Sequence, residues 1–535
     1  MTVPAARPPR AADGGRQSRD ARGRTALRVL GLDDGATLAG DVIDVVSPLT
    51  GSSIGRVPLL GPDDVARAAR QAHAAQEQWA STGVRERSRV LLALHDLIWR
   101  LRDPLLDLVQ WESGKARAHA FEELADTAMT ARYYARAGAR HLAAERRRGA
   151  VPGLTGVAVH HRPLGVVGII SPWNYPLTLA ASDAVAALMA GNAVVLKPDS
   201  ATPFTALAVR SLLVRTGADP GLLQVVTGAG AALGAPLIDA VNALMFTGSA
   251  AAGSAVASRA GGRLIPVSAE LGGKNPLIVR ADAPLARTVR GTVRACFSNA
   301  GQLCVSIERV YVHRDVWDRF VPALVRATGA LRVGATMGWE TDMGPLISAE
   351  HRARVAAHVD DAVARGATVL TGGRALEDVG PTAYAPTLLT GVTGDMAVHS
   401  AETFGPVAAL YRVSGDEEAV RAANASPYGL NASVWTSDPR AGAALAGRIR
   451  AGTVNVNEGY AAAWGSTAAP MGGMGASGLG RRHGPEGILK YTQSQTIAVQ
   501  RLMPLQAPPG VGEERWAAAL TAWLRLARRL PGLDR

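Results

Sequence analysis

Only two thiols occur among the 535 residues of this chain, at Cys296 and Cys304. Cys304 lies in the segment FSNAGQLCVS, beside a glycine and other small residues that would leave its thiol accessible. A deprotonated thiol attacks carbonyl carbon readily. Free cysteines are more often buried and structural, which is our interpretation of Cys296, so the role of Cys304 depends on the groups that accompany it.

A carboxyl group and an amide group stand in segments suited to assist such a thiol. Glu270 precedes two glycines in SAELGGKNP, and a carboxylate next to a flexible hinge suits general-base work on a water molecule. Asn174 lies in SPWNYP directly after the apolar run GVVGII, where its amide can donate to an oxyanion. The alternative for Asn174 is a turn residue before Tyr175 and Pro176.

Two more segments at strand ends are typical of dinucleotide binding. KPDS (197–200) follows the apolar run NAVVL, and FTGS (246–249) follows another such run and leads to Gly253. A glycine-rich exit from a strand into a helix can hold a phosphate at the helix N-terminus, although this pattern is not GxGxxG. The chain has 53 arginines but only four lysines, at Lys115, Lys197, Lys274 and Lys490. We interpret these lysines as positions that need a compact ammonium.

The elements around these residues alternate between short apolar runs and helical segments. This alternation begins at Gly165 and resumes after Cys304, which predicts two α/β domains with parallel sheets. Helical periodicity precedes it in three segments, 62–79, 85–102 and 121–144. Residues 156–165 and 492–501 are expected to be strands outside both sheets, suited to pairing across a subunit boundary.

Composition excludes several classes of protein. Hydrophobic residues make up 47% and charged residues 19%, as in a globular protein, and no run of 18 apolar residues predicts a membrane span. The net charge is +12, but residues 1–28 alone carry +5, so no basic face for nucleic acid is expected in the body. Residues 1–28 are predicted to be disordered. Two cysteines without zinc spacing predict a cytoplasmic protein without a metal site.

Together the motifs resemble those of the aldehyde dehydrogenase superfamily over about residues 40–500. They are PWNYP, KPDS, FTGS, ELGGK, GQLC, ETFGP (402–406) and MGGMGASGLGRRHG (471–484). The resemblance implies an α/β fold with a Rossmann-like cofactor domain, an α/β catalytic domain and a small β oligomerisation hairpin, and hence a homodimer or homotetramer. The implied limits are 36–155 and 166–300 for the cofactor domain, 301–480 for the catalytic domain, and 156–165 and 488–503 for the hairpin.

The resemblance also implies a role for each motif residue. Cys304 would be the nucleophile, Glu270 the base that activates the deacylating water, and Asn174 with the Cys304 backbone N–H the oxyanion hole. The aldehyde would form a hemithioacetal, lose hydride to a nicotinamide, and leave as an acid after hydrolysis of the thioester. The cofactor-binding residues would be Trp173, Lys197, Pro198, Asp199, Ser200, Gly248, Ser249, Leu271, Glu402 and Phe404.

Cofactor and substrate are less closely defined. Ser200 stands where NAD-preferring members often have Glu, which favours NADP and leaves NAD as the alternative. The longer match resembles the actinobacterial branch named NADP-dependent succinate-semialdehyde dehydrogenase. However, Ser182 and Ser298 replace two arginines that hold the substrate carboxylate in well-studied relatives, and Tyr460 and Trp464 favour an apolar aliphatic or aromatic aldehyde.

Other reactions fit the residues less well. A CoA-acylating dehydrogenase would not need Glu270, and the sequence offers no motif for a Cys–His hydrolase. The remaining alternative outside the oxidoreductases is a catalytically silent structural homologue.

The C-terminus continues beyond the resemblance through the linker PLQAPPGVG (504–512). In residues 513–530 an apolar stripe with Trp516 and Trp523 faces away from several arginines on a helical wheel. Such a segment can lie on an anionic membrane surface as a peripheral contact. The alternative is that the stripe docks on the body of the enzyme or on a partner subunit.

Overall fold

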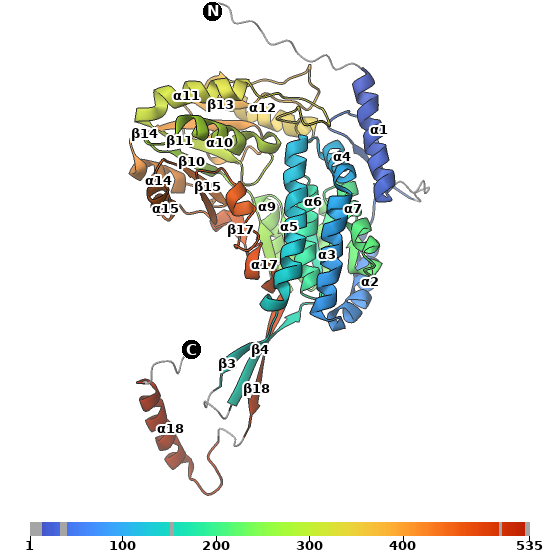
Figure 1. Cartoon of the computed structure of the whole chain (residues 1–535), viewed down its shortest axis with the longest axis vertical. Coiled ribbons are helices and arrows are strands. Elements are labelled where there is room, and N and C mark those ends of the chain that lie inside the picture. The colour runs from blue at the N-terminus through green and yellow to red at the C-terminus, as the bar shows by residue number, and fades with distance from the viewer. Residues whose placement is uncertain (1–12, 33–39, 150–154, 502–505, 530–535) are drawn as a thin grey trace, which may run out of the picture.

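The computed structural model describes residues 13–32, 40–149, 155–501 and 506–529. Two sheets with helices on their faces form the body, and a narrow arm extends below it (Figure 1). The expected α/β fold with two sheets and a small third sheet is therefore confirmed.

A six-stranded sheet forms the first unit of the body. Its strand order is β17-β9-β8-β5-β6-β7, and every pair is parallel except β17 with β9. The strands are β5 (Val166–Ser171), β6 (Ala193–Pro198), β7 (Leu223–Val225), β8 (Ala243–Thr247), β9 (Val267–Glu270) and β17 (Gly478–Leu479). β6 and β8 are buried throughout because helices cover the sheet, which explains their unbroken apolar runs.

Two groups of helices pack around this sheet. The crossover helices are α6 (Pro176–Met189), α7 (Pro203–Arg215), α8 (Gly230–Ala240) and α9 (Ala250–Gly262). The preceding helices are α2 (Pro62–Ser81), α3 (Val84–Arg100), α4 (Arg102–Ser113) and α5 (Arg117–His141), with the hairpin β1 (Val42–Val46) and β2 (Ser53–Pro58) before them. Periodicity predicted α2, α3 and α5 to within a few residues but not α4.

A seven-stranded sheet forms the second unit. Its order is β12-β13-β14-β11-β10-β15-β16, with β12 antiparallel to β13 and the other pairs parallel. The strands are β10 (Asn275–Val279), β11 (Ile307–His313), β12 (Thr368–Thr371), β13 (Thr387–Thr390), β14 (Val407–Val413), β15 (Asn431–Trp435) and β16 (Thr453–Val456). The helices are α10 (Leu285–Phe297), α11 (Arg314–Gly329), α12 (Ala349–Ala364), α13 (Ala397–Ser400), α14 (Asp416–Asn424), α15 (Pro439–Ala446) and α16 (Ala461–Trp464). The short helix α17 (Gly484–Leu489) packs on α5 and α6 of the first unit.

The sheets divide the chain differently from the expected domain limits. β10 precedes residue 300 but lies at the centre of the second sheet, while β17 returns to the first sheet near residue 478. Strand periodicity shows that a strand exists but not which sheet it joins, and the two sheets do not separate at residue 300.

The N-terminal prediction needs a correction as well. Residues Asp13–Leu30 form helix α1, which packs on α4, so the expected disorder over 1–28 is wrong from residue 13 onward. Asp20 accepts a hydrogen bond from the Trp111 indole N–H (3.0 Å), and Gly23 lies against the Trp111 ring. The helix buries few apolar side chains, so composition gave little sign of it. Residues 1–12 lie outside the described part of the chain.

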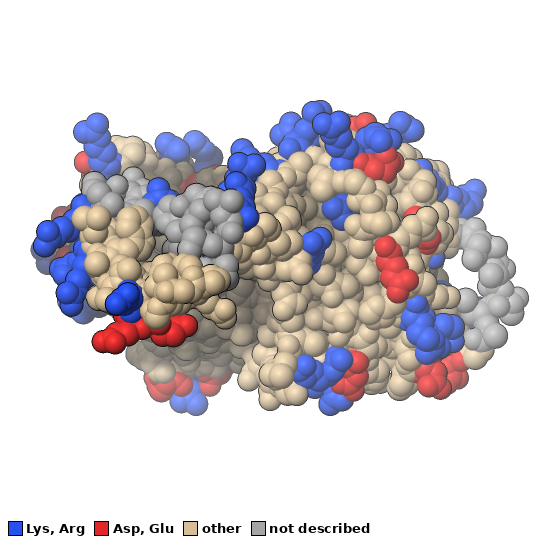
Figure 2. Space-filling view, turned by 90° about the horizontal axis from the view of Figure 1, so that it is seen from below, with Lys and Arg blue, Asp and Glu red and all other residues tan. Residues whose placement is uncertain are grey.

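The arm consists of β3 (Glu145–Arg148), β4 (Thr155–Pro163), β18 (Thr492–Gln500) and α18 (Glu513–Ala527). β4 pairs antiparallel with both β3 and β18 in a separate sheet, as expected of strands outside the two main sheets. Seen from below, basic side chains gather around the arm (Figure 2). Among the described helices, none is long and apolar enough to cross a bilayer.

Candidate active site

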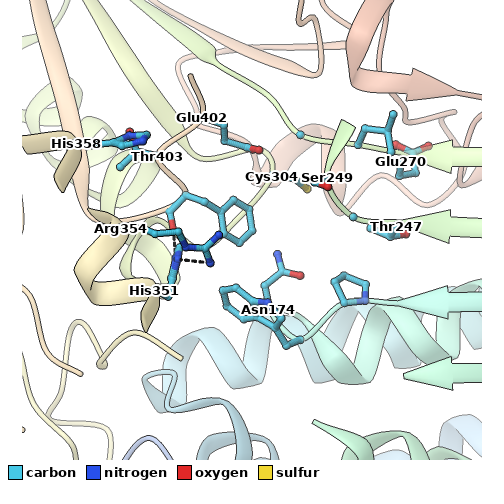
Figure 3. A pocket seen from close by; sticks show the side chains of 16 residues that line it. Asn174, Thr247, Ser249, Glu270, Cys304, His351, Arg354, His358, Glu402 and Thr403 are labelled. Carbon is cyan, nitrogen blue, oxygen red and sulfur yellow. Dashed lines mark hydrogen bonds between the residues drawn. The ribbon is translucent and has the colours of Figure 1, made fainter. Parts of the chain in front are cut away.

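A cavity of about 360 Å³ lies where the strands β5, β8 and β9 end and the second unit begins. Cys304, Glu270 and Asn174 all border it (Figure 3). The lining residues are Pro172, Trp173, Asn174, Thr247, Gly248, Ser249, Glu270, Leu271, Gly272, Cys304, His351, Arg354, His358, Glu402, Thr403 and Phe404. The fold thus brings together the three candidate catalytic residues and six of the ten candidate cofactor residues.

A tight turn presents Cys304 to the cavity. Asn299 and Ala300 have left-handed backbone angles (φ 51° and 56°), and Gly301 follows at φ 71°. A Cβ on Gly301 would lie 2.0 Å from the Gly405 carbonyl oxygen, so only glycine fits there. Burial raises the pKa of Cys304 to about 12, while the charge of Arg482 acts in the opposite direction. The free thiol therefore needs a base or a bound substrate to react.

Asn174 contacts the turn that carries Cys304. It follows β5, and its side-chain Nδ2 donates to the Gln302 carbonyl oxygen (3.1 Å), two residues before Cys304. The amide has two N–H groups, so one remains for an oxygen atom at the cavity. This contact holds the Asn174 side chain next to the segment that carries Cys304. A residue that served only the turn before Tyr175 and Pro176 would not need it.

Glu270 is the last residue of β9 and is 6% exposed. Its Oε1 has no hydrogen-bond partner among the described residues. Burial raises the pKa of Glu270 to about 7, with Arg482 and Lys490 opposing the rise. A carboxyl with a pKa near neutrality and a free oxygen is suited to take a proton from water.

The loop before β14 supplies the opposite wall. Glu402 accepts a hydrogen bond from the Gly273 N–H (2.9 Å), and burial followed by the charge of Glu308 raises the pKa of Glu402 to about 8. Phe404 has a left-handed backbone (φ 53°) and its ring meets that of Trp173 edge-on at 5.6 Å between centroids. This wall presents a flat aromatic surface and a carboxyl group beside Cys304.

The remaining candidate cofactor residues continue the same sheet edge. Ser249 caps α9 by accepting from the Ala252 N–H (3.3 Å), which leaves the helix N-terminus at the cavity. Lys197 and Pro198 end β6, next to β5, and Ser200 donates to the Gly228 carbonyl oxygen (3.1 Å). The Asp199 carboxylate accepts from the Ala201 N–H and so closes the turn. Lys197, Pro198, Asp199 and Ser200 lie outside the cavity lining, on the adjoining strand end.

A group of basic residues on α12 also borders the cavity and was not predicted from the sequence. His351, Arg354 and His358 line the cavity, and the His351 side chain contacts the Phe404 carbonyl oxygen (2.8 Å). Arg354 in turn contacts the His351 ring (3.2 Å). Their spacing of three and four residues puts them on one helix face. The same spacing can be read in the segment HRARVAAH, but a helix face exposed to solvent would show it too.

A second, smaller cavity of about 40 Å³ opens on the other side of Cys304 and Asn174. Its wall is mostly apolar, with Tyr175, Trp464 and Met471, but Arg482 also borders it. The Arg482 guanidinium pairs with Asp183 (2.7 Å) and donates to Thr247 Oγ1 (2.6 Å). Ser182 lines this cavity too, whereas Ser298 is buried against the Arg294 carbonyl oxygen. In the described ranges no group of His, Cys, Asp and Glu is arranged to hold a metal ion.

Comparison with known proteins identifies the family of this chain. Residues 36–497 match the aldehyde dehydrogenase family, and the chain belongs to this family. The chain is 50% identical over 483 residues to a Mycolicibacterium smegmatis protein named "Putative succinate-semialdehyde dehydrogenase", NADP-type, covering 90% of this chain and 93% of that protein. The expected enzyme class, an NAD(P)-dependent aldehyde dehydrogenase, is thereby confirmed.

Two solved structures show the same fold. The crystal structure of succinate-semialdehyde dehydrogenase from Burkholderia pseudomallei matches with a TM-score of 0.83 and 35% identity, covering 86% of this chain and 95% of that chain. A Staphylococcus aureus betaine aldehyde dehydrogenase in complex with NAD+ matches with a TM-score of 0.84 and 29% identity, covering 92% of this chain and 99% of that chain.

Proposed function

We propose that this protein oxidises succinate semialdehyde, or a small aldehyde with a similar carboxylate tail, to the acid with NADP as cofactor. The observation that supports this substrate is the cation of Arg482 beside a small cavity at the nucleophile. Arg482 lies at neither position of the two arginines that the sequence lacks, so it offers the carboxylate a different partner. The name of the mycobacterial relative points to the same substrate and cofactor.

The site residues divide the reaction into two halves. The Cys304 thiolate attacks the carbonyl carbon, and the carbonyl oxygen becomes an oxyanion that accepts from Asn174 Nδ2 and the Cys304 N–H. The nicotinamide cofactor would supply the acceptor for the hydride that leaves this carbon, and Cys304 would remain bound to the acyl group as a thioester. Glu270 then takes a proton from water, whose oxygen attacks the thioester carbon while the C–S bond breaks and Cys304 leaves as thiolate.

The cofactor-binding residues fit a dinucleotide on geometric grounds. The capped N-terminus of α9 at Gly248 and Ser249 would suit the pyrophosphate, and Leu271, Trp173 and the wall residues would lie around the nicotinamide. Glu402 would hold the nicotinamide ribose and Phe404 would lie against the ring. Lys197 with Pro198, Asp199 and Ser200 would hold the adenosine ribose.

The choice of NADP over NAD rests on Ser200 beside Lys197. A hydroxyl next to an ammonium leaves room and charge for a 2′-phosphate, and the Asp199 carboxylate is occupied by the turn. Wild-type kcat/KM should favour NADP, and Ser200→Glu should reverse the preference because its carboxylate repels the 2′-phosphate. A wild type that already prefers NAD would refute this argument.

The substrate proposal is tested with a pair of aldehydes of similar size, succinate semialdehyde and butanal. NADPH absorbance gives kcat/KM for each, and we expect the semialdehyde to be favoured. Arg482→Met should lower the ratio of the two values about tenfold or more, on the scale of one charged hydrogen bond. Effects of Arg482 on Cys304 or Glu270 are common to both aldehydes and cancel in the ratio. Asp183 keeps Lys490 and Tyr491 as partners in this variant.

An unchanged ratio would instead favour the apolar aldehyde suggested by Tyr460 and Trp464. Trp464 does pack edge-on against Tyr175 in the wall of the smaller cavity. In that case longer uncharged aldehydes should exceed both test substrates. No turnover with any aldehyde would leave a catalytically silent homologue.

We also propose a homo-oligomer, a homodimer or homotetramer, and a cytoplasmic location. The exposed strand β18 at the edge of the arm supports the oligomer, since Ile497 and Val499 are 39% and 54% exposed. Both cysteines are free thiols, which supports a reducing compartment. Measurement of the mass in solution decides between monomer and oligomer.

A peripheral membrane contact of the arm is the second part of this proposal. Helix α18 does not dock on the body of its own chain, because no residue of Glu513–Ala527 is buried and Leu524 is 61% exposed. The described arm, residues 145–148, 155–163, 492–501 and 506–529, holds nine arginines and three glutamates. Anionic lipid attracts this basic arm. Residue 530, the end of the expected segment 513–530, lies outside the described residues.

The membrane contact is tested by sedimentation with vesicles. Full-length protein should co-sediment with anionic vesicles, less so in high salt and not with neutral ones. Leu520→Glu with Leu524→Glu should abolish binding, while Ala518→Glu with Ala522→Glu on the polar face should retain more of it at the same net charge. Truncation after Gln506 should release the protein with its activity intact. Failure of the full-length protein to bind at low salt would refute the contact and favour docking on a partner subunit.

A further inference from the structure

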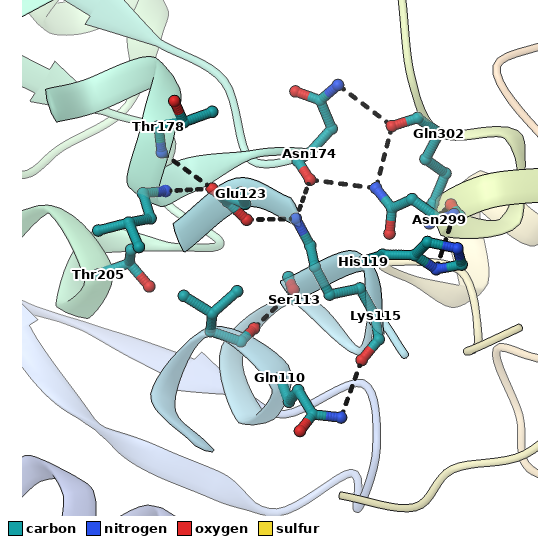
Figure 4. Close-up of polar contacts among 12 residues, drawn as sticks. Gln110, Ser113, Lys115, His119, Glu123, Asn174, Thr178, Thr205, Asn299 and Gln302 are labelled. Carbon is teal, nitrogen blue, oxygen red and sulfur yellow. Dashed lines mark hydrogen bonds and ion pairs between the residues drawn. The ribbon is translucent and has the colours of Figure 1, made fainter. Parts of the chain in front are cut away.

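One of the four lysines, Lys115, has no part in the reaction as described so far, yet it is placed directly behind the oxyanion donor. Its side chain is 0% exposed and forms an ion pair with Glu123 (2.6 Å), whose side chain is also 0% exposed. Such a pair is costly to bury and is therefore weak support for stability alone. The contacts of its ammonium group indicate another use (Figure 4).

The Lys115 ammonium donates to the main chain of the active site. Nζ lies 2.7 Å from the Asn174 carbonyl oxygen, and the Asn299 side-chain amide donates to the same oxygen (3.1 Å). Nζ also lies 3.8 Å from the centre of the Tyr175 ring, the next residue in the chain. Two donors on one carbonyl, with a ring held beside it, leave the Asn174 backbone little freedom.

Glu123, the partner of Lys115, binds the backbone that follows Asn174 in the chain. Its Oε1 accepts from the backbone N–H of Leu177 and of Thr178 (3.1 Å), in the first turn of α6. That helix begins at Pro176 and has no side-chain cap of its own, so Glu123 from α5 supplies the acceptor that the first turn needs. The ion pair therefore fixes the chain on both sides of Asn174 and Tyr175.

We propose that Lys115, held by Glu123, is a positioning residue for the oxyanion hole, an inference that rests on the proposed role of Asn174. By fixing the Asn174 main chain, the pair directs the Asn174 side-chain amide toward the substrate oxygen. Placement to a fraction of an ångström is what makes a preorganised donor effective. The convergence of both partners on one small nitrogen explains lysine here, since a planar guanidinium spreads its donors and needs more room.

The test removes the charges of Lys115 and Glu123 together and measures whether the resulting loss of burst rate depends on Asn174. Lys115→Met with Glu123→Gln leaves no unpaired buried charge, so the protein should fold, which thermal unfolding checks. The rate of the first hydride transfer, measured as a burst at saturating cofactor, should fall about tenfold or more, a part of the 10² to 10³ expected for loss of the donor itself. In an Asn174→Ala background the same pair should change the burst less than about twofold.

A second buried pair provides a matched control. Lys274 and Glu308 are equally enclosed, and Glu308 accepts from the Thr403 and Phe404 N–H groups on the opposite wall. Lys274→Met with Glu308→Gln should lower the burst rate by the same factor whether or not Asn174 is present, since this pair acts on a different loop.

The outcomes separate this inference from the function on which it rests. Equal losses from the Lys115 pair in both backgrounds would overturn the positioning role and leave the oxyanion role of Asn174 intact. A small loss for Asn174→Ala alone would overturn the oxyanion role and, with it, the positioning role. A burst that falls only in the presence of Asn174 is the result expected.

Discussion

The pKa of Glu270 gives the sharpest prediction about the reaction. The base acts in its deprotonated form, and burial raises its pKa to about 7, above the usual value of 4.5. At pH 6 about a tenth of the enzyme would have an ionised Glu270 and at pH 8 about nine tenths. Steady-state turnover should therefore rise about tenfold from pH 6 to pH 8 where deacylation limits the rate. An ordinary glutamate would give a flat profile in this range.

The measurement pairs steady-state turnover with the burst of NADPH in the first cycle. Glu270→Gln should lose about 10² to 10⁴ in turnover, while the burst survives because hydride transfer precedes the step that needs the base. The remaining turnover of the variant should lose the rise between pH 6 and 8. A variant whose burst disappears together with its turnover would refute the assignment, because Glu270 would then act before or during hydride transfer.

Two further predictions concern the thiols and the N-terminal helix. Cys304→Ala should abolish aldehyde oxidation, while Cys296→Ala, buried at 1% exposure, should stay within a few-fold of wild type; equal losses would contradict the nucleophile assignment. Gly23→Ala should lower the free energy of unfolding by about 1–3 kcal/mol through overpacking, because its Cβ would lie 2.0 Å from the Trp111 ring. If α1 did not dock on Trp111, the same change would stabilise the helix by about 1 kcal/mol. The sign of the change in the free energy of unfolding therefore shows whether α1 docks there.

The candidate catalytic residues could be identified from the sequence alone because they lie in short, recognisable segments. Cys304, Glu270 and Asn174 come from three separate motifs. Asn174 and Glu270 lie at the carboxyl ends of β5 and β9, which parallel strands bring to one edge of the first sheet. Cys304 lies in the turn before β11 of the second sheet, so its approach to the same cavity did not follow from the predicted strands. Their geometry needed the structure, since no periodicity predicts that Asn174 contacts the Gln302 carbonyl oxygen.

Contacts between distant segments were beyond the reach of sequence patterns. Nothing in the helical segment 121–144 distinguished Glu123 from its neighbours, and only the packing of α5 against α6 shows it buried beneath Asn174. Arg482 occurs in a glycine-rich motif, where nothing indicated that it would border the cavity at Cys304. Helix α1 was missed because its stability depends on a tryptophan of α4, about ninety residues away.

The rarity of lysine proved to be a signal of a different kind, because all four lysines surround the site. Lys115 donates to the Asn174 carbonyl oxygen, Lys197 ends β6 at the cofactor edge, and Lys274 pairs with Glu308 behind the Glu402–Phe404 wall. Lys490 donates to Asp183 (3.2 Å) and lies 3.4 Å from Ser268, two residues before Glu270. In a chain that uses arginine for nearly every other cation, lysine remains where one small nitrogen must serve several converging acceptors, or a phosphate, in a confined space. Composition thus identified Lys115 and Lys490, two positions near the site that lie in none of the motifs.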